Sequence, residues 1–128
     1  MGMWIKRTLR VLIAGLALLL IVLGLRWLID PGGISPLFGF RLESGLGLSS
    51  QVGDLSAFFL VAGLCVLFAL VSYRKIWYYP AAMLLFFAAT GRTVAWVIHG
   101  ADFALEMIIF EVVVASLFLA GSRVLAEG

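Results

Sequence analysis

The chain has very few of the side chains that usually carry chemistry, with one histidine and one cysteine among 128 residues. A single cysteine, Cys65, cannot form a disulfide within the chain and therefore gives no indication of the redox compartment. One histidine and one cysteine are too few ligands for a usual zinc, haem or iron–sulfur site. They also exclude the common nucleophilic triads, because no second histidine or oriented base is present to activate a serine. We therefore expect no cofactor, no metal and no catalytic residue.

The chain is also poor in charge and in recognisable motifs. It contains no HExxH, CxxC, GxGxxG or P-loop pattern. Charged residues make up 12% of the sequence and hydrophobic residues 64%, with a mean hydropathy of +1.17. A soluble domain has about 25% charged residues, so this composition is typical of a membrane protein. We expect a single transmembrane domain over residues 1–128, without room for a soluble catalytic domain.

Four segments are long and apolar enough to cross the membrane as helices, since about 20 apolar residues are needed. They run over about 9–29, 54–73, 76–99 and 102–121. Asp54 is well placed as an N-cap or first-turn anion of the second segment, and Pro80 falls in the first turn of the third. We predict an all-α fold in which four transmembrane helices form an antiparallel bundle.

The distribution of basic residues predicts the orientation of this bundle. One side carries six of them: Lys6, Arg7, Arg10, Arg74, Lys75 and Arg123. The other side carries only Arg41, so the positive-inside rule places both termini in the cytoplasm. A pI near 9.0 therefore reflects orientation, and we expect no nucleic-acid partner. The first apolar run is too long for a signal peptide and lacks a small-residue cleavage site, which favours an uncleaved helix.

The longest connection is predicted between the first two helices, over residues 30–53. Its prolines and many glycines make it irregular, while Ile34, Leu37, Phe38 and Phe40 make it apolar. Such a segment suits a lid that lies in the headgroup region over the bundle. A passive linker that partitions into the membrane interface explains the composition equally well. Trp27 is expected near the same interface.

Charged residues inside the apolar segments are the best functional lead. Arg92 lies in the third segment, and Glu106 and Glu111 lie in the fourth. Ionised side chains in the bilayer cost about 2.5–3.5 kcal/mol on insertion scales, so they usually pair and often mark functional sites. Arg26 and Asp54 lie at a similar predicted depth on the first two segments. The candidate cluster, ligand-binding or structural, is Arg26, Asp54, Arg92, Trp96, His99, Glu106 and Glu111.

A purely structural role for this cluster remains open. An Arg–Glu pair can fix helix register without any function. Arg26 can extend to the lipid headgroups, and His99 at a loop edge is usually solvated. The sequence does not decide which glutamate pairs with Arg92. Small residues at Gly91 and Ala95, and at Ser116 and Ala120, permit close helix approach within the bundle or against a partner.

The order of these features resembles a bacterial family of small four-helix membrane proteins known only as a domain of unknown function. The likeness is carried by Arg26, Phe38-Gly39 after a Pro-Gly loop, Asp54, Gly91-Arg92 and either Glu106 or Glu111. The resemblance implies a multi-pass protein of the bacterial inner membrane, with Arg26, Asp54, Arg92 and Glu111 as its signature. It implies no activity.

Three functions are compatible with the sequence. The first is an accessory or assembly subunit of a larger membrane complex, which would contact lipids and another membrane protein or a second copy of itself. The second is a binding protein for a lipid, quinone or sterol-like ligand in an outer-leaflet pocket around Arg92. The third is a small membrane isomerase or proton-coupled transporter that uses Glu106 and Glu111. We expect a non-catalytic protein and give the accessory role first place.

Overall fold

The computed structural model describes residues 2–128; residue 1, at which the predicted domain begins, lies outside the described residues. All regular structure in residues 2–128 is helical. The elements are α1 (Met3–Ile29), α2 (Pro31–Ile34), η1 (Ser35–Phe38), α3 (Gly45–Ser72), η2 (Lys75–Trp77), α4 (Tyr78–His99) and α5 (Leu105–Val124). The four long helices are each long and apolar enough to cross a membrane, α4 together with η2. The prediction of an all-helical protein with four such helices is confirmed.

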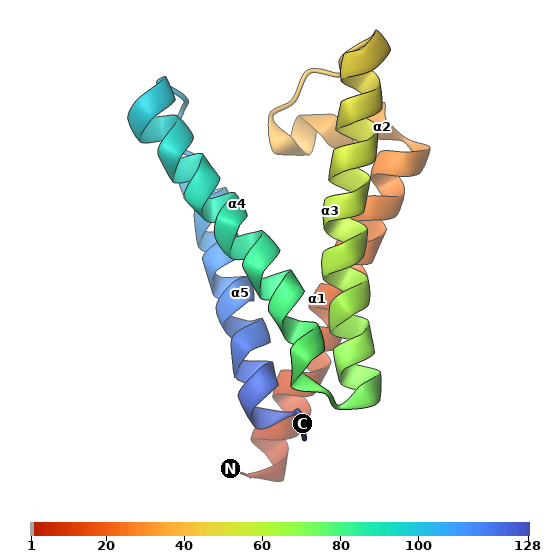
Figure 1. Ribbon diagram of the computed structural model, residues 1–128, viewed down its shortest axis with the longest axis vertical. Helices are drawn as coiled ribbons and strands as arrows, with labels where there is room; N and C mark the ends of the chain where they lie inside the picture. Colours follow the sequence, from red (N-terminus) through yellow and green to blue (C-terminus); the bar gives the residue numbers. More distant parts are fainter. Residues whose placement is uncertain (1) are drawn as a thin grey trace.

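The long helices form two pairs that meet at one end of the molecule and diverge toward the other. α1 lies along α3, and α4 lies along α5 (Figure 1). Both ends of the chain lie where the pairs meet, which we call the terminal end. We call the opposite end, where α2 and the α4–α5 turn lie, the distal end. The pairs are therefore splayed and do not stay in contact along their whole length.

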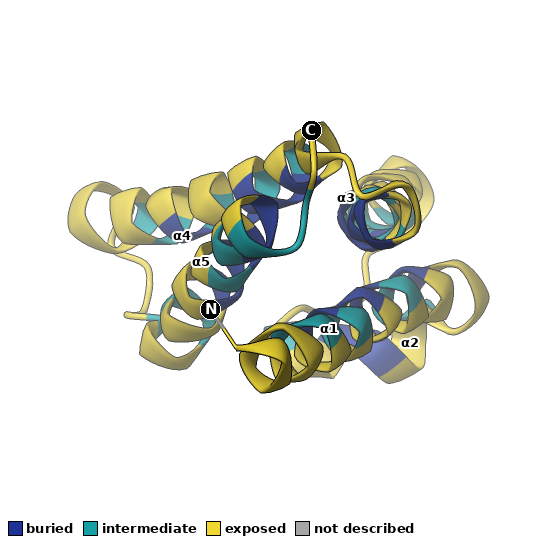
Figure 2. Cartoon of the chain, turned by 90° about the horizontal axis from the view of Figure 1, so that it is seen from below, coloured by how far each residue is buried: buried dark blue, intermediate teal, exposed yellow. Residues whose placement is uncertain are grey.

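Buried residues cover the facing sides of the helices, while the outward faces are exposed and apolar (Figure 2). Within the α1–α3 pair, the backbones approach closely at two buried glycines. A Cβ on Gly63 would lie 2.8 Å from the carbonyl oxygen of Ala17, and one on Gly24 would lie 2.7 Å from Cγ of Leu60. Small residues permit this close approach, which is the usual way in which helices associate in lipid.

Polar contacts join the chain at the terminal end. Arg10 Nη2 donates a hydrogen bond to the carbonyl oxygen of Leu70 at 2.6 Å, and its guanidinium lies 4.7 Å from the ring centroid of Tyr73. The Glu127 amide donates to the Tyr73 carbonyl at 2.7 Å, and the Lys75 amide donates to the Gly128 carbonyl at 2.8 Å. These contacts tie α1, the α3–α4 turn and the C-terminal residues together.

The predicted start of the second helix was wrong. We expected a helix from Asp54 and a loop up to residue 53, but α3 already begins at Gly45, so Asp54 is neither an N-cap nor a first-turn residue. The Gln51 side chain explains the difference: it accepts from the Glu43 amide at 2.8 Å and donates to the Arg41 carbonyl at 2.9 Å. These bonds hold the residues before the helix against its early turns.

The predicted start of the fourth helix was wrong as well. We expected a helix from Asp102, whereas α5 begins at Leu105. α4 ends at His99, and the Gly100 that follows has the left-handed φ of 72° that glycine adopts without strain. Residues 101–104 are then needed to reverse the chain, so Glu106 lies in the first turn of α5. α1 begins six residues before the expected position 9, at Met3.

Candidate functional site

The main cavity of interest lies between the two helix pairs in the distal half of the molecule. Its volume is about 360 Å³, and all four long helices contribute to its wall. Its lining is mostly aliphatic and aromatic: Leu23, Leu37, Phe38, Phe40, Leu55, Phe58, Phe59, Leu85, Ala88, Arg92, Glu106, Met107, Phe110 and Glu111. Ligand sites typically have such volumes and combine an apolar wall with a few convergent polar groups.

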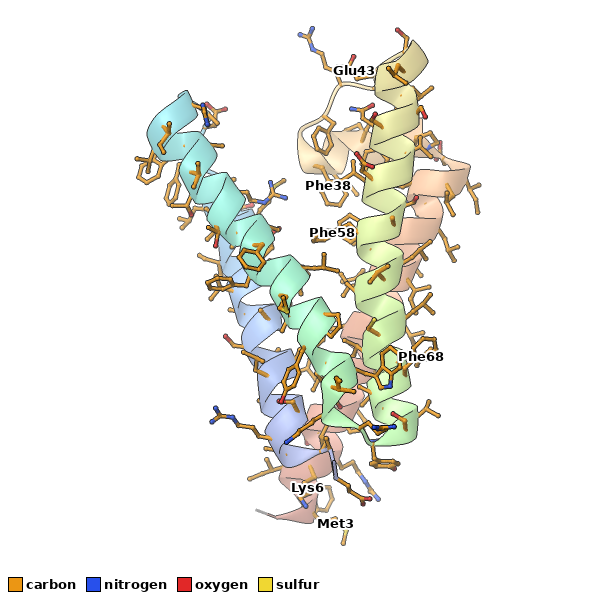
Figure 3. All side chains as sticks on the ribbon, viewed as in Figure 1. Met3, Lys6, Phe38, Glu43, Phe58 and Phe68 are labelled. Carbon is orange, nitrogen blue, oxygen red and sulfur yellow. The ribbon has the colours of Figure 1, made fainter. Side chains whose placement is uncertain are left out.

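Residues 30–44, which we call the connecting segment, supply part of the cavity wall. Pro31 is the first residue of the short helix α2, and Pro36 is the second residue of η1. Gly39 then reverses the chain with a φ of 73°. This turn brings Phe38 and Phe40 to the cavity. Figure 3 shows Phe38 and Phe58 projecting from the connecting segment and from α3 into the space between the helix pairs.

Trp27 is the residue on which the connecting segment packs. Its ring centroid lies 5.9 Å from those of both Phe38 and Phe40, and Phe38 in turn lies 5.3 Å from Phe59. Trp27 is fully buried, and its Nε1 has no hydrogen-bond partner among the described residues. The connecting segment thus folds back over the Trp27 ring.

An ion pair joins α4 to α5 at the cavity wall. Arg92 Nε donates to Glu111 Oε1 at 2.9 Å. The Glu111 side chain is 7% exposed and that of Arg92 is 31% exposed, so the glutamate lies within the protein and the arginine reaches the cavity. Of the two candidate glutamates, the structure therefore pairs Glu111 with Arg92. Glu106 also lines the cavity, in the first turn of α5.

The ion pair leaves hydrogen-bonding capacity unused. Arginine has five N–H donors, and within residues 2–128 only Nε of Arg92 has a protein partner. The two terminal amino groups are therefore available to a molecule in the cavity. Because Glu111 holds the guanidinium in place, these donors are oriented before a ligand arrives, which reduces the entropic cost of binding.

Two of the other predicted site residues lie outside this cavity. Arg26 forms an i,i+4 pair with Asp30, with 3.5 Å between Nη2 and Oδ2, and both side chains are about half exposed at 45% and 59%. Asp54 is exposed on α3. Neither lines the cavity, so the structure does not bring either residue to Arg92.

Trp96 and His99 also lie outside the cavity wall. Trp96 packs against Phe103 with 4.3 Å between ring centroids and 32° between the ring planes. His99 is the last residue of α4 and is exposed. Both were predicted for the same cluster as Arg92, but neither lines the cavity. The structure therefore brings together Arg92, Glu106 and Glu111 from the predicted cluster.

The apolar residues of the wall were not predicted as a set. Leu55, Phe58 and Phe59 follow the i, i+3, i+4 spacing of one helix face, and this spacing could have identified the contribution of α3. Nothing comparable marks Leu23 or Met107, because the helices are apolar on every side. Their place in the cavity depends on how the two pairs diverge.

Comparisons with known proteins give no independent lead. No protein-family model matches the chain, and neither the curated proteins nor the solved structures contain a significant match to it. The function therefore has to be inferred from the geometry of the cavity and its ion pair.

Proposed function

We propose that this protein is a non-catalytic membrane protein that binds a lipophilic molecule in the cavity between its helix pairs. The observation that carries the proposal is an apolar, aromatic cavity with the Arg92–Glu111 pair in its wall. An apolar body would contact Phe58, Phe59 and Phe110. A polar head would accept hydrogen bonds from the terminal amino groups of Arg92.

The placement of the ion pair supports a binding role over a purely structural one. A pair that only fixes register gains most when both partners are buried and fully hydrogen-bonded. Here the arginine is the more exposed partner, at 31%, and it faces a cavity. The cost of holding a partly satisfied cation in an apolar wall is offset when a ligand supplies the missing acceptors.

The membrane arrangement is part of this proposal. We infer an antiparallel four-helix arrangement in the bacterial inner membrane, with both termini and residues 73–77 in the cytoplasm. The cavity, which lies in the distal half, then opens in the outer leaflet. The likeness to a family of small four-helix membrane proteins is consistent with this placement and adds no activity.

The proposal is tested by extracting the protein from its host membrane in a mild detergent and identifying bound molecules by native mass spectrometry. We expect one defined lipophilic molecule per chain and its loss in an Arg92→Gln variant. Arg26→Gln is the matched control, because Arg26 lies outside the cavity. Equal retention of the molecule by wild type and Arg92→Gln would refute the proposal.

A second candidate function is that of an accessory subunit, and one observation favours it. Gly91 is exposed on α4, and a Cβ added there would meet nothing within 4 Å. Gly91 is therefore not used for packing inside the chain, and this position is open to another helix, of a larger complex or of a second copy.

Association through this face is tested with Gly91→Leu, which would prevent close helix approach. We expect a stoichiometric protein partner in the native mass spectrum of the wild type and its loss in the variant. Gly15→Leu is the control, since Gly15 on α1 also has nothing within 4 Å of an added Cβ. A wild-type chain that stays monomeric and free of protein partners contradicts the subunit role.

A further inference from the structure

An apolar groove lies on the outside of the α3–α4 contact, next to the cavity. Its volume is about 550 Å³. It is lined by Phe58, Val61, Pro80, Met83, Leu84, Phe87 and Ala88, none of which is charged. Phe58 and Ala88 line both the groove and the cavity, so the two spaces are adjacent at these residues.

We propose that the cavity and the groove form one site for an amphiphile with an uncharged, carbonyl-bearing head and a single long hydrocarbon tail. The head occupies the cavity at Arg92, and the tail passes between Phe58 and Ala88 into the groove. This inference rests on the proposed function and narrows it, because it excludes rigid, sterol-like ligands and anionic ones.

The charges of the cavity determine the nature of the head. Its wall carries one formal positive charge, on Arg92, and two formal negative charges, on Glu106 and Glu111. The cavity therefore has no net attraction for an anion. The unused donors of Arg92 still require an acceptor, and a carbonyl oxygen supplies one without adding charge. The flat aromatic side chains of Phe38, Phe40 and Phe110 suit a planar head.

The sizes and directions of the two spaces determine the nature of the tail. The cavity, at about 360 Å³, lies near the lower limit for ligand sites and has room for a head of one ring but not for a long tail as well. Along α4, the groove extends from Ala88 to Pro80, which is about 12 Å at 1.5 Å per residue. A flexible chain leaving the cavity can therefore lie along α4, parallel to the neighbouring lipid chains.

A hydrocarbon tail will prefer the groove to the surrounding lipid only if it fits the groove closely, because both are equally hydrophobic. Lipid tails are as apolar as the groove, so transferring a chain from lipid to protein gains little from the hydrophobic effect. The gain comes from contacts with Val61, Met83 and Phe87 that the tethered chain makes without further loss of translational freedom. A bulkier side chain in the groove should therefore weaken the binding of ligands with a tail and leave the binding of tailless ligands unchanged.

The test uses the whole protein in nanodiscs and measures bound probe by native mass spectrometry. The long-tail probes are decylubiquinone and monoolein, which distinguish a ring head from an ester head; the tailless probe is dimethoxymethylbenzoquinone. Oleate is the anionic, tailed comparison. Val61→Phe fills the groove, and Val71→Phe is the matched control on the same helix, at a residue that is 73% exposed and lines neither space.

We expect at least one long-tail uncharged probe to bind about tenfold more tightly than oleate. Val61→Phe should weaken the binding of that probe about tenfold. Val71→Phe should leave binding of the tailed probe unchanged, and Val61→Phe should leave binding of the tailless probe unchanged. Unchanged tailed binding in Val61→Phe overturns the groove as the tail site, and equal or tighter oleate binding overturns the uncharged head.

Failure of this inference is distinguishable from failure of the proposed function. If Arg92→Gln abolishes binding of the probes while Val61→Phe has no effect, the cavity binds a lipophilic molecule but the groove does not hold its tail. If Arg92→Gln and wild type bind every probe equally, the cavity is not the binding site, and both proposals fall.

Discussion

At the scale of single residues, the Arg92–Glu111 ion pair is the contact in which each partner depends most on the other. Glu111 is almost fully buried, and Arg92 is its only side-chain partner among residues 2–128. A buried pair is costly to break from one side, because the remaining charge loses its compensation. Removing both charges together avoids that penalty. The pair therefore predicts strong coupling between the two positions.

We predict this coupling for a double-mutant cycle of Arg92→Met and Glu111→Leu. Arg92→Met alone should destabilise the protein more than the double variant, because it leaves Glu111 buried without a partner. The coupling energy should be about 0.5–3 kcal/mol, the range for residues in contact. Denaturant unfolding in detergent micelles, followed by circular dichroism, measures each free energy of unfolding.

Glu106 is the control for this cycle. It lines the same cavity but is exposed and makes no ion pair among the described residues. Combining Glu106→Leu with Arg92→Met should therefore give additive changes. If the changes in unfolding free energy were additive for Arg92→Met with Glu111→Leu but not for Arg92→Met with Glu106→Leu, Arg92 would pair with Glu106 instead.

The charged residues of the site and the apolar residues of the connecting segment could be predicted from the sequence, while the rest of its apolar wall could not. Arg92, Glu106 and Glu111 are conspicuous because an ionised group is expensive in an apolar helix. Arg26 and Asp54 were predicted for the site on the same ground, yet they lie away from the cavity. Their position near helix ends or on outward faces lets such side chains reach polar surroundings, and composition alone does not reveal which way they point.

At the scale of the elements, the α1–α3 pair depends on two glycines that bring the backbones together. The approach at Gly63 is limited by backbone atoms of α1: an added Cβ would lie 2.8 Å from the Ala17 carbonyl oxygen and 2.9 Å from the Ile21 nitrogen. Backbone atoms in a paired helix cannot move aside singly, so the two helices would have to separate.

We predict opposite effects for two Gly→Ala substitutions. Gly63→Ala should lower the free energy of unfolding by about 1–3 kcal/mol, the usual cost of overpacking. Gly15→Ala should raise it by up to about 1 kcal/mol, because alanine is the better helix former and nothing lies within 4 Å of its Cβ. Unfolding in detergent micelles measures both, and a stabilising Gly63→Ala would contradict the close α1–α3 contact.

The number and approximate place of the helices could be predicted because a run of about 20 apolar residues that crosses a membrane must satisfy its own backbone hydrogen bonds, which a helix does. Helix ends were harder. Residues 45–53 contain three glycines and two serines, which favour a loop, yet Gln51 ties the chain so that α3 begins at Gly45. Such a side-chain contact depends on the folded connecting segment and leaves no periodic signal.

At the scale of the whole molecule, the two ends differ in both contacts and charge. Backbone hydrogen bonds between the C-terminal residues and both Tyr73 and Lys75 join the helix pairs at the terminal end, while the pairs diverge at the distal end and leave the cavity between them. The basic residues that flank the helices gather at the terminal end, with Arg41 near the distal end. The orientation proposed from this asymmetry would place the cavity in the outer leaflet.

Cysteine labelling tests this orientation. In a Cys65→Ser background, Leu46→Cys marks the distal end, where Leu46 is 85% exposed, and Ile76→Cys marks the terminal end, where Ile76 is 58% exposed. Because lysine and arginine near helix ends are retained on the cytoplasmic side, a membrane-impermeant maleimide should label Leu46→Cys in intact bacterial spheroplasts. It should label Ile76→Cys only after the membrane is permeabilised. The reverse pattern would place the cavity in the cytoplasmic leaflet, and its ligand would then have to enter between α3 and α4 from that leaflet.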